Sequence, residues 1–292
     1  MLLLRSLLYV PGSNPRALSK APTLGADGLL LDLEDSVAPE AKETAREALV
    51  EFLRQPPPGL WLGVRLNALD SPWWEADLEA IVPARPHALC LPKISHPEEL
   101  TPLLQRLEAL ESAHGIAPPL APPLPLLPMI ETPRGVIHAH DIARQPRVMG
   151  LAAGVNDLAK GLRLRRTGGD RQPLRHALQQ LVLAARAAER MVFDGVYNQV
   201  RDEAGCAAEC DEAAWLGFDG KTLIHPSQIA PANRAFLPSA EEAEGAQRLV
   251  EGWRAAQAAG REVCLVDGTL VERLHVTAAE RLLALRVQAL EA

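Results

Sequence analysis

Short apolar runs alternate with longer segments rich in Ala, Leu, Glu and Arg along most of the chain. Continuous apolar runs of this length are typical of strands that are buried on both faces, as in parallel sheets. Most of the runs end in a polar or charged residue. The eight runs are Leu7–Val10, Gly28–Leu33, Leu60–Val64, Ala88–Pro92, Pro128–Glu131, Arg147–Val155, Phe193–Tyr197 and Gly220–Pro226.

The segments between the runs have helical length and composition, as in Pro39–Arg54, Pro97–His114, Leu174–Met191 and Cys206–Leu216. Strands that alternate with helices pair in parallel through right-handed crossovers. Eight such units over about 230 residues predict an α/β fold of the (β/α)8 TIM-barrel type. An open doubly wound sheet would carry a G-x-G-x-x-G loop after its first strand. Residues 11–15 contain one glycine, so the barrel is favoured.

The pattern changes after Pro238, which predicts a barrel domain over residues 1–238 and a C-terminal helical extension over 239–292. Ser239 followed by two glutamates predicts the start of a helix that ends near Ala259. A strand or hairpin over residues 263–268 and a last helix from about Thr277 complete the extension. We interpret this extension as a lid or an oligomerisation arm.

Composition limits the classes of partner. The chain has 292 residues, 48% of them hydrophobic, and a net charge of −7, so its overall field does not favour nucleic acid. Four scattered cysteines do not form a disulfide framework. The apolar N-terminus is interrupted by Arg5 and ends at Pro11, too short for a membrane span and without a cleavage site. We therefore expect a cytoplasmic protein without membrane or nucleic-acid partners.

Polar residues at the ends of the predicted strands are the candidates for chemistry, because barrel closure brings strand ends to one face. They are Glu34, Asp35, Arg65, Asn67, Lys93, Glu131, Asn156, Asp157 and His225. Four acids and two long cations cannot share a dry pocket without compensation, which a hard cation bound by oxygen ligands provides.

Glu131 and Asp157 leave room for water and substrate around a cation, which suits Mg²⁺. No His/Cys cluster accompanies them, so zinc is disfavoured. The alternative is that each acid caps a helix or pairs with Arg65 or Lys93. Arg65 has a planar fork suited to a carboxylate or oxyanion, and Lys93 could act as a base or neutralise the acids.

Seven ordered motifs together resemble the citrate lyase β-subunit family, within the group of Mg²⁺-dependent lyases that act on CoA thioesters. They are residues 5–12 (RSLLYVPG), 31–37 (LDLEDSV), 64–67 (VRLN), 91–93 (LPK), 130–135 (IETPRG), 156–159 (NDLA) and 217–228 (GFDGKTLIHPSQ). The resemblance spans nearly the whole chain. It implies a (β/α)8 barrel assembled as a homotrimer or hexamer.

The resemblance also implies roles for residues. Glu131 and Asp157 would bind Mg²⁺, Arg65 would hold the 2-oxo acid product, and Glu34 and Asp35 would contact the waters of the metal. Asn67 and Lys93 are expected beside the substrate. The residues expected to meet CoA are Tyr9, Pro11, Gly12, Arg16 and Lys20.

The implied reaction cleaves a 3-hydroxyacyl-CoA, such as citryl-, malyl- or citramalyl-CoA, into a 2-oxo acid such as oxaloacetate and an acyl-CoA, or forms it from them. Active family members carry an aspartate in a C-terminal segment like Asp-Gly-x-Met-Ile-Asp-x-Pro. Here residues 267–274 read DGTLVERL, so Glu272 stands in its place and the proline is absent. Asn156 also replaces a common glutamate. A metal-dependent aldolase on free hydroxy-oxo acids and a catalytically weak binding subunit therefore stay open as alternatives.

Overall fold

The computed structural model describes residues 3–119, 121–165 and 171–291. The chain divides into two compact units, Leu4–Ala232 and the segment from Asn233 onward. The sequence pattern placed this change six residues later, after Pro238. Helix α10 (Ile229–Ala235) spans the boundary. No helix among the described residues combines the length and apolar character that a membrane crossing needs.

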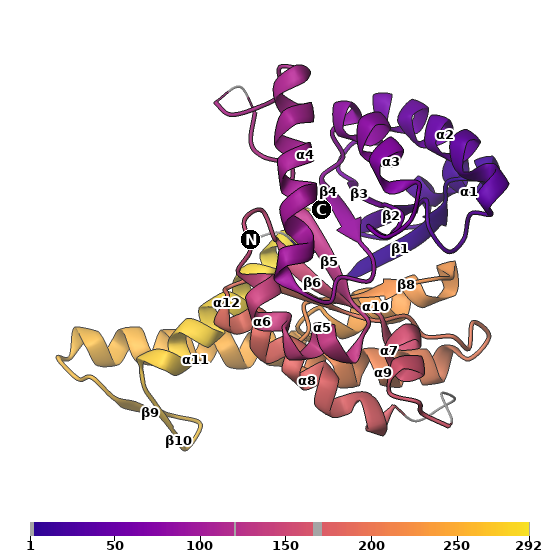
Figure 1. Cartoon of the computed structure of the whole chain (residues 1–292). Helices are drawn as coiled ribbons and strands as arrows, with labels where there is room; N and C mark the ends of the chain where they lie inside the picture. The colour runs from indigo at the N-terminus through magenta and orange to yellow at the C-terminus, as the bar shows by residue number, and fades with distance from the viewer. Residues whose placement is uncertain (1–2, 120, 166–170, 292) are drawn as a thin grey trace. The chain divides into compact units, whose positions relative to one another are not determined.

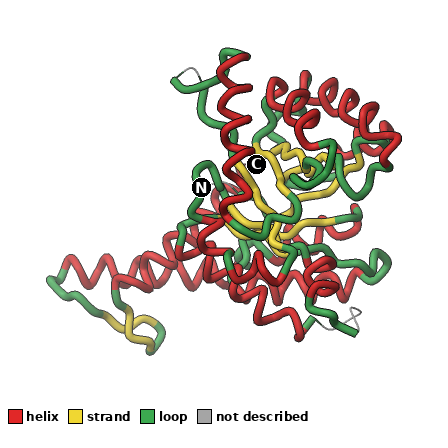
Figure 2. Tube along the Cα trace, in the orientation of Figure 1, coloured by secondary structure: helices red, strands yellow, loops and turns green. Residues whose placement is uncertain are grey.

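The first unit is a closed barrel of parallel strands in sequential order, with β8 hydrogen-bonded back to β1 (Figures 1 and 2). The predicted (β/α)8 fold is confirmed. The strands are β1 (Ser6–Pro11), β2 (Gly28–Asp32), β3 (Trp61–Arg65), β4 (Ala88–Leu91), β5 (Leu126–Ile130), β6 (Gly150–Ala153), β7 (Met191–Asp194) and β8 (Gly220–Leu223).

Helices surround the strands. Two crossovers enter their helix through a short 3₁₀ turn, which begins at Pro39 in one and at Pro97 in the other, because proline fits the first position of a helix and lacks the N–H that would go unbonded there. The helices are α1 (Pro15–Lys20), α2 (Lys42–Arg54), α3 (Trp74–Ile81), α4 (Leu100–Ala113), α5 (Pro133–Ile137), α6 (Ala139–Ala143), α7 (Val155–Gly161), α8 (Gln172–Ala187) and α9 (Glu203–Leu216). The 3₁₀ turns are η1 (Ala21–Thr23), η2 (Pro39–Ala41), η3 (Val82–Ala84), η4 (Pro97–Glu99) and η5 (Pro226–Gln228).

The interior of the barrel is filled by one face of each strand. Leu30, Trp61, Met129 and Phe193 belong to this core cluster. A Cβ at Gly63 would lie 2.7 Å from the Trp61 ring, so glycine is needed beside this large side chain. Because side chains two apart share a face, the same strands that carry the apolar core place polar residues above it, at their C-terminal ends.

The outer face of β7 and β8 carries a buried ion-pair network. Lys221 Nζ lies 2.6 Å from Asp194 Oδ2 and 2.7 Å from Glu209 of α9. Arg171, at the start of α8, reaches the same aspartate at 2.7 Å. Lys221 and Asp194 are fully buried, so their opposite charges must pair within the protein. This network fastens two helices to two strands.

The second unit contains α11 (Ala240–Ala258), a hairpin of β9 (Cys264–Val266) and β10 (Thr269–Val271), and α12 (Arg273–Glu291). The predicted helix start is confirmed as a capping box, in which Ser239 Oγ accepts from the Glu242 N–H at 3.1 Å. The last helix begins at Arg273, four residues before the predicted Thr277. Trp253 and Val276 belong to a separate apolar core of this unit.

Candidate active site

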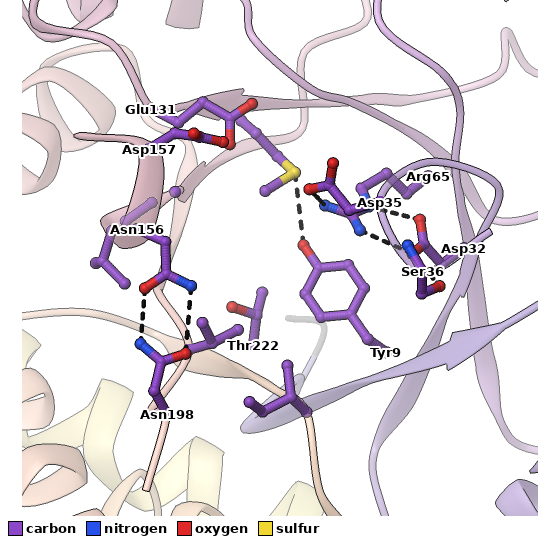
Figure 3. A pocket seen from close by; sticks show the side chains of 16 residues that line it. Tyr9, Asp32, Asp35, Ser36, Arg65, Glu131, Asn156, Asp157, Asn198 and Thr222 are labelled. Carbon is purple, nitrogen blue, oxygen red and sulfur yellow. Dashed lines mark hydrogen bonds and ion pairs between the residues drawn. The ribbon is translucent and has the colours of Figure 1, made fainter. Parts of the chain in front are cut away.

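A cavity of about 330 Å³ opens at the C-terminal ends of the barrel strands. Figure 3 shows its side chains, which come from most of the strand ends of the barrel. This is the face at which a barrel of this type carries its chemistry. The lining residues are Tyr9, Asp32, Asp35, Ser36, Arg65, Met129, Glu131, Ala153, Gly154, Val155, Asn156, Asp157, Val196, Asn198, Thr222 and Ile224.

Glu131 follows β5 directly and is 4% exposed. Its Oε1 accepts a hydrogen bond of 2.5 Å from the backbone N–H of Lys93, a residue whose φ of 59° lies in the left-handed region. A Cβ at Gly154 would overlap the Glu131 side chain, so the glycine makes room for this carboxylate. Burial, together with the charges of Glu34 and Asp157, raises the Glu131 pKa to about 7.

Asp157 lies in the first turn of α7 and is partly exposed. It lines the same cavity as Glu131, and its charge is one of the causes that raise the pKa of Glu131. Within the described ranges no group of three or more His, Cys, Asp or Glu side chains is arranged to hold a metal. Two acids that line one cavity, neither of them in an ion pair within the described residues, fit a hard cation such as Mg²⁺, which is commonly held by one or two carboxylates and completes its shell with water and ligand oxygens.

Arg65 ends β3 and is held on several sides. Its Nε and Nη2 each lie 2.7 Å from an oxygen of Asp32, which is a bidentate pair. Its Nη1 lies 3.0 Å from Glu34 Oε2 and 3.5 Å from Asp35 Oδ2. The guanidinium carbon also lies 4.7 Å from the centre of the Tyr9 ring, which is a cation–π contact. The arginine is therefore oriented before any ligand arrives.

Asp32 is a site residue that the sequence interpretation missed, because it lies inside an apolar run. Besides Arg65 it binds the backbone N–H groups of Glu34 at 2.9 Å and Ser36 at 3.1 Å, and the Ser36 hydroxyl. Burial alone would raise the Asp32 pKa, but the hydrogen bonds and charge of Arg65, together with the hydrogen bonds from Ser36 and the Glu34 N–H, outweigh it and lower the pKa. Asp32 and Arg65 lie opposite each other in the adjacent strands β2 and β3. This pairing could have indicated the role of Asp32, but it can be found only once the register of the two strands is known.

Glu34 and Lys93 support the carboxylate wall from outside the cavity lining. Lys93 Nζ donates to Glu34 Oε1 at 2.7 Å, while its backbone holds Glu131. Burial raises the Glu34 pKa, although Arg65 and Lys93 lower it. Glu34 Oε2 is buried and makes no hydrogen bond within the described structure, since Arg65 lies close but outside hydrogen-bond geometry. The acids of this wall exceed the cations that balance them.

Two amides face each other on another side of the cavity. Asn156 Nδ2 donates to Asn198 Oδ1 at 3.2 Å, and Asn198 Nδ2 donates to Asn156 Oδ1 at 2.7 Å (Figure 3). This pair connects the first turn of α7 to the loop after β7. Asn198 was missed from sequence, because its loop carries no periodic signal.

Several predicted residues do not line the cavity. The Asn67 side chain and backbone N–H both bind Asp77 of α3, at 2.7 and 2.9 Å. Gly12 packs closely on the Asp32 backbone, and the neighbouring Pro11 is also outside the lining. Arg16 and Lys20 are exposed on α1.

Two further predicted groups have other surroundings. His225 caps η5 through the Ser227 N–H. Glu272 is exposed and directly precedes α12, in the second compact unit. Of the acids and cations predicted at the strand ends, the cavity brings together Asp35, Arg65, Glu131 and Asp157.

Comparison with known proteins identifies the family of the chain. The family model described as HpcH/HpaI aldolase/citrate lyase matches residues 5–226, which is most of the chain. The chain belongs to this family. The resemblance drawn from the seven motifs is thereby confirmed.

Among curated relatives, the (3S)-malyl-CoA thioesterase of Cereibacter sphaeroides strain KD131 is 43% identical over 281 residues, covering 96% of this chain and 93% of the relative. The citrate lyase subunit beta of Escherichia coli K12 is 36% identical over 273 residues, covering 92% and 88%.

Two solved structures are similar over nearly the full length. A citrate lyase from Burkholderia xenovorans LB400 has a TM-score of 0.86 at 25% identity, covering 100% of this chain and 93% of that chain. The CitE protein of Mycobacterium tuberculosis, solved with magnesium, acetoacetate and coenzyme A, has a TM-score of 0.77 at 31% identity and covers 97% of each chain.

Proposed function

We propose that this protein is a Mg²⁺-dependent carbon–carbon lyase acting on a 3-hydroxyacyl-CoA of the malyl-, citryl- or citramalyl-CoA type. The observation that carries the proposal is one cavity in which Glu131 and Asp157 share space with an arginine already oriented by Asp32. The CitE relative bound to magnesium, acetoacetate and coenzyme A supports the choice of metal and ligand class.

Glu131 and Asp157 would hold the Mg²⁺. Glu34 and Asp35 both lie beside Arg65 Nη1, and they would contact the waters bound to the Mg²⁺. Bound Mg²⁺ would supply Lewis acidity at the hydroxyl and carboxylate oxygens of the ligand. Lys93 serves both acids, by its side chain to Glu34 and by its backbone to Glu131. It sets the geometry of the carboxylates without entering the cavity.

Arg65 would bind the carboxylate of the 2-oxo acid half. Its side-on edge is occupied by Asp32, so the ligand meets the remaining N–H groups at the end of the guanidinium. The substrate hydroxyl loses its proton to solvent and becomes the carbonyl of the 2-oxo acid as the adjacent carbon–carbon bond breaks. The electron pair of that bond forms a thioester enolate, which must take up a proton. We assign that proton transfer to Glu272 from a neighbouring copy of the chain, which requires a homo-oligomer.

The CoA part is too large to share the cavity with the acyl group and would lie outside it. Arg16 and Lys20 are exposed cations on the helix that follows β1, and they suit the CoA phosphates. Pro11 and Gly12 shape the backbone that leads from β1 to this helix.

Hydrolysis of the thioester is the second candidate. The 43%-identical relative is named a malyl-CoA thioesterase, and Glu272 replaces the aspartate expected in lyases of this group. A misplacement of about 1 Å can lower a rate by about 100-fold, so the longer glutamate bears directly on carbon–carbon cleavage.

The products distinguish the two reactions. Purified protein with Mg²⁺ and (3S)-malyl-CoA is assayed in parallel for glyoxylate and for free CoA thiol. Lyase activity gives glyoxylate without thiol, whereas hydrolysis gives thiol without glyoxylate. Asp157→Asn and metal removal with EDTA are expected to abolish either product. Equal turnover in EDTA would refute the metal site. A chain that forms neither a 2-oxo acid nor free CoA thiol from malyl-, citryl- or citramalyl-CoA would refute the enzymatic proposal.

A further inference from the structure

The phenol of Tyr9 is fixed inside the cavity by its neighbours. Tyr9 lies in β1, and its ring packs on the apolar core of the barrel. Arg65 covers the ring from one side, with the guanidinium carbon 4.7 Å from the ring centre. Because Asp32 holds that guanidinium by two hydrogen bonds of 2.7 Å, the ring and the cation fix each other.

The hydroxyl of Tyr9 has a weak partner. Among the described residues its hydrogen-bond partner is Met129 Sδ at 3.5 Å, drawn in Figure 3 as the dashed line from the Tyr9 hydroxyl to a sulfur. A thioether is a weak acceptor, whereas a phenol is a good donor. A phenylalanine would fill the same space without this poorly satisfied group, so packing alone does not explain a tyrosine here.

The charge balance of the site gives the hydroxyl a use. The cavity wall already holds an excess of carboxylates around Arg65 and Glu131, and another ionisable acid would add to that excess. A neutral donor can bind a ligand oxygen without adding charge. Burial raises the Tyr9 pKa well above its ordinary value, so the phenol keeps its proton over the working pH range.

We propose that the Tyr9 hydroxyl donates a hydrogen bond to a carboxylate or oxo oxygen of the 2-oxo acid half of the ligand. This inference rests on the proposed function, because it assumes that this half enters the cavity. Arg65 covers the Tyr9 ring, the Tyr9 hydroxyl reaches Met129, and Met129 precedes Glu131 by two residues at the C-terminal end of β5; all four residues line the cavity. A ligand held by Arg65 and by a cation at Glu131 therefore places its oxygens beside Tyr9. This role replaces the CoA contact that the sequence suggested for Tyr9.

The test is Tyr9→Phe, which keeps the ring and the cation–π contact. Calorimetry measures the binding of Mg²⁺ alone and then of oxaloacetate at saturating Mg²⁺. We expect unchanged Mg²⁺ affinity and a Kd for oxaloacetate raised about tenfold, the effect of losing one hydrogen bond to a charged group. The urea midpoint should not fall, because the lost partner is a thioether.

Tyr197→Phe is the matched control, since it removes a phenol hydroxyl that donates to Asp202 at 2.7 Å and does not line the cavity. It should leave oxaloacetate binding unchanged. If the wild type and Tyr9→Phe bind oxaloacetate with the same Kd, this inference is overturned and the proposed function stands. Loss of both Mg²⁺ and oxaloacetate binding in Tyr9→Phe also overturns it, because that result indicates a structural role. Failure of the wild-type protein to bind any of oxaloacetate, pyruvate and glyoxylate overturns both proposals.

Discussion

Replacing Glu131 by glutamine is expected to stabilise the metal-free protein while abolishing its response to Mg²⁺. The carboxylate is 4% exposed, and its pKa is raised from an ordinary value of 4.5 to about 7, first by burial and then by Glu34 and Asp157. A raised acid pKa means that the ionised form is disfavoured in the folded state. Glutamine removes the charge but retains an oxygen that can accept from the Lys93 N–H.

The magnitude follows from linkage. Between pH 4.5 and about 7 the folded protein binds a proton at Glu131 that the unfolded chain has lost, so this group makes the free energy of unfolding fall as pH rises. Each pKa unit corresponds to about 1.4 kcal/mol, and we expect a gain of about 2–3 kcal/mol for Glu131→Gln at pH 8. The gain should shrink as pH falls through 7 and vanish near 4.5.

Urea unfolding of both proteins from pH 4.5 to 8, with EDTA or with Mg²⁺, measures these effects. Saturating Mg²⁺ should stabilise the wild type and leave Glu131→Gln unchanged. Asp157→Asn is the matched control, since it removes a more exposed carboxylate from the same site and should abolish the Mg²⁺ response with a stability change below about 1 kcal/mol. A variant less stable than the wild type in EDTA at pH 8 would refute the reasoning, as would a difference that does not depend on pH.

Three further substitutions test how the barrel supports the site. Gly154→Ala should displace Glu131 and lower Mg²⁺ affinity at least tenfold in calorimetry, whereas Gly245→Ala, within α11 and free of close contacts, should raise the free energy of unfolding by about 0.5–1 kcal/mol. Asp32→Asn should lower that free energy by about 3 kcal/mol in urea, because it leaves a buried arginine charge underpaired, and a loss under 1 kcal/mol would contradict this account. Lys221→Ala should be destabilised by about 3–5 kcal/mol, and wild-type stability in thermal unfolding would exclude the buried network as a support.

Local sequence patterns are informative where they coincide with what the tertiary structure requires. A strand buried on both faces has to be apolar throughout, so short runs reported the barrel strands with errors mainly at their ends. The seventh run was placed at Phe193–Tyr197, whereas β7 is Met191–Asp194. The predicted strand extended too far, to Gly195 and Tyr197, which belong to the loop after β7. The error arose because apolar residues continue past the last hydrogen bond between the strands.

Acids directly after a run were equally visible, and Glu131 and Asp157 share one cavity as expected. The residues that were missed lie where no local pattern distinguishes them. Asp32 ends an apolar strand and becomes a site residue through its register with Arg65. Asn198 lies in a loop and reaches the cavity wall, where it bonds Asn156, whereas Asn67 lies outside the cavity lining because its side chain bonds Asp77 of α3. Each outcome depends on a partner that is distant in sequence.

By itself, then, the sequence determined the alternation of strand and helix, the closed parallel barrel and the end of it that carries polar groups. These follow from periodicity and from the burial of both faces of every strand, which are properties of short segments. The tertiary structure decided which polar groups meet. Barrel closure and strand register set Arg65 against Asp32 and Tyr9, and set Glu131 beside Gly154, because distances between charges are fixed only when separate segments are brought together.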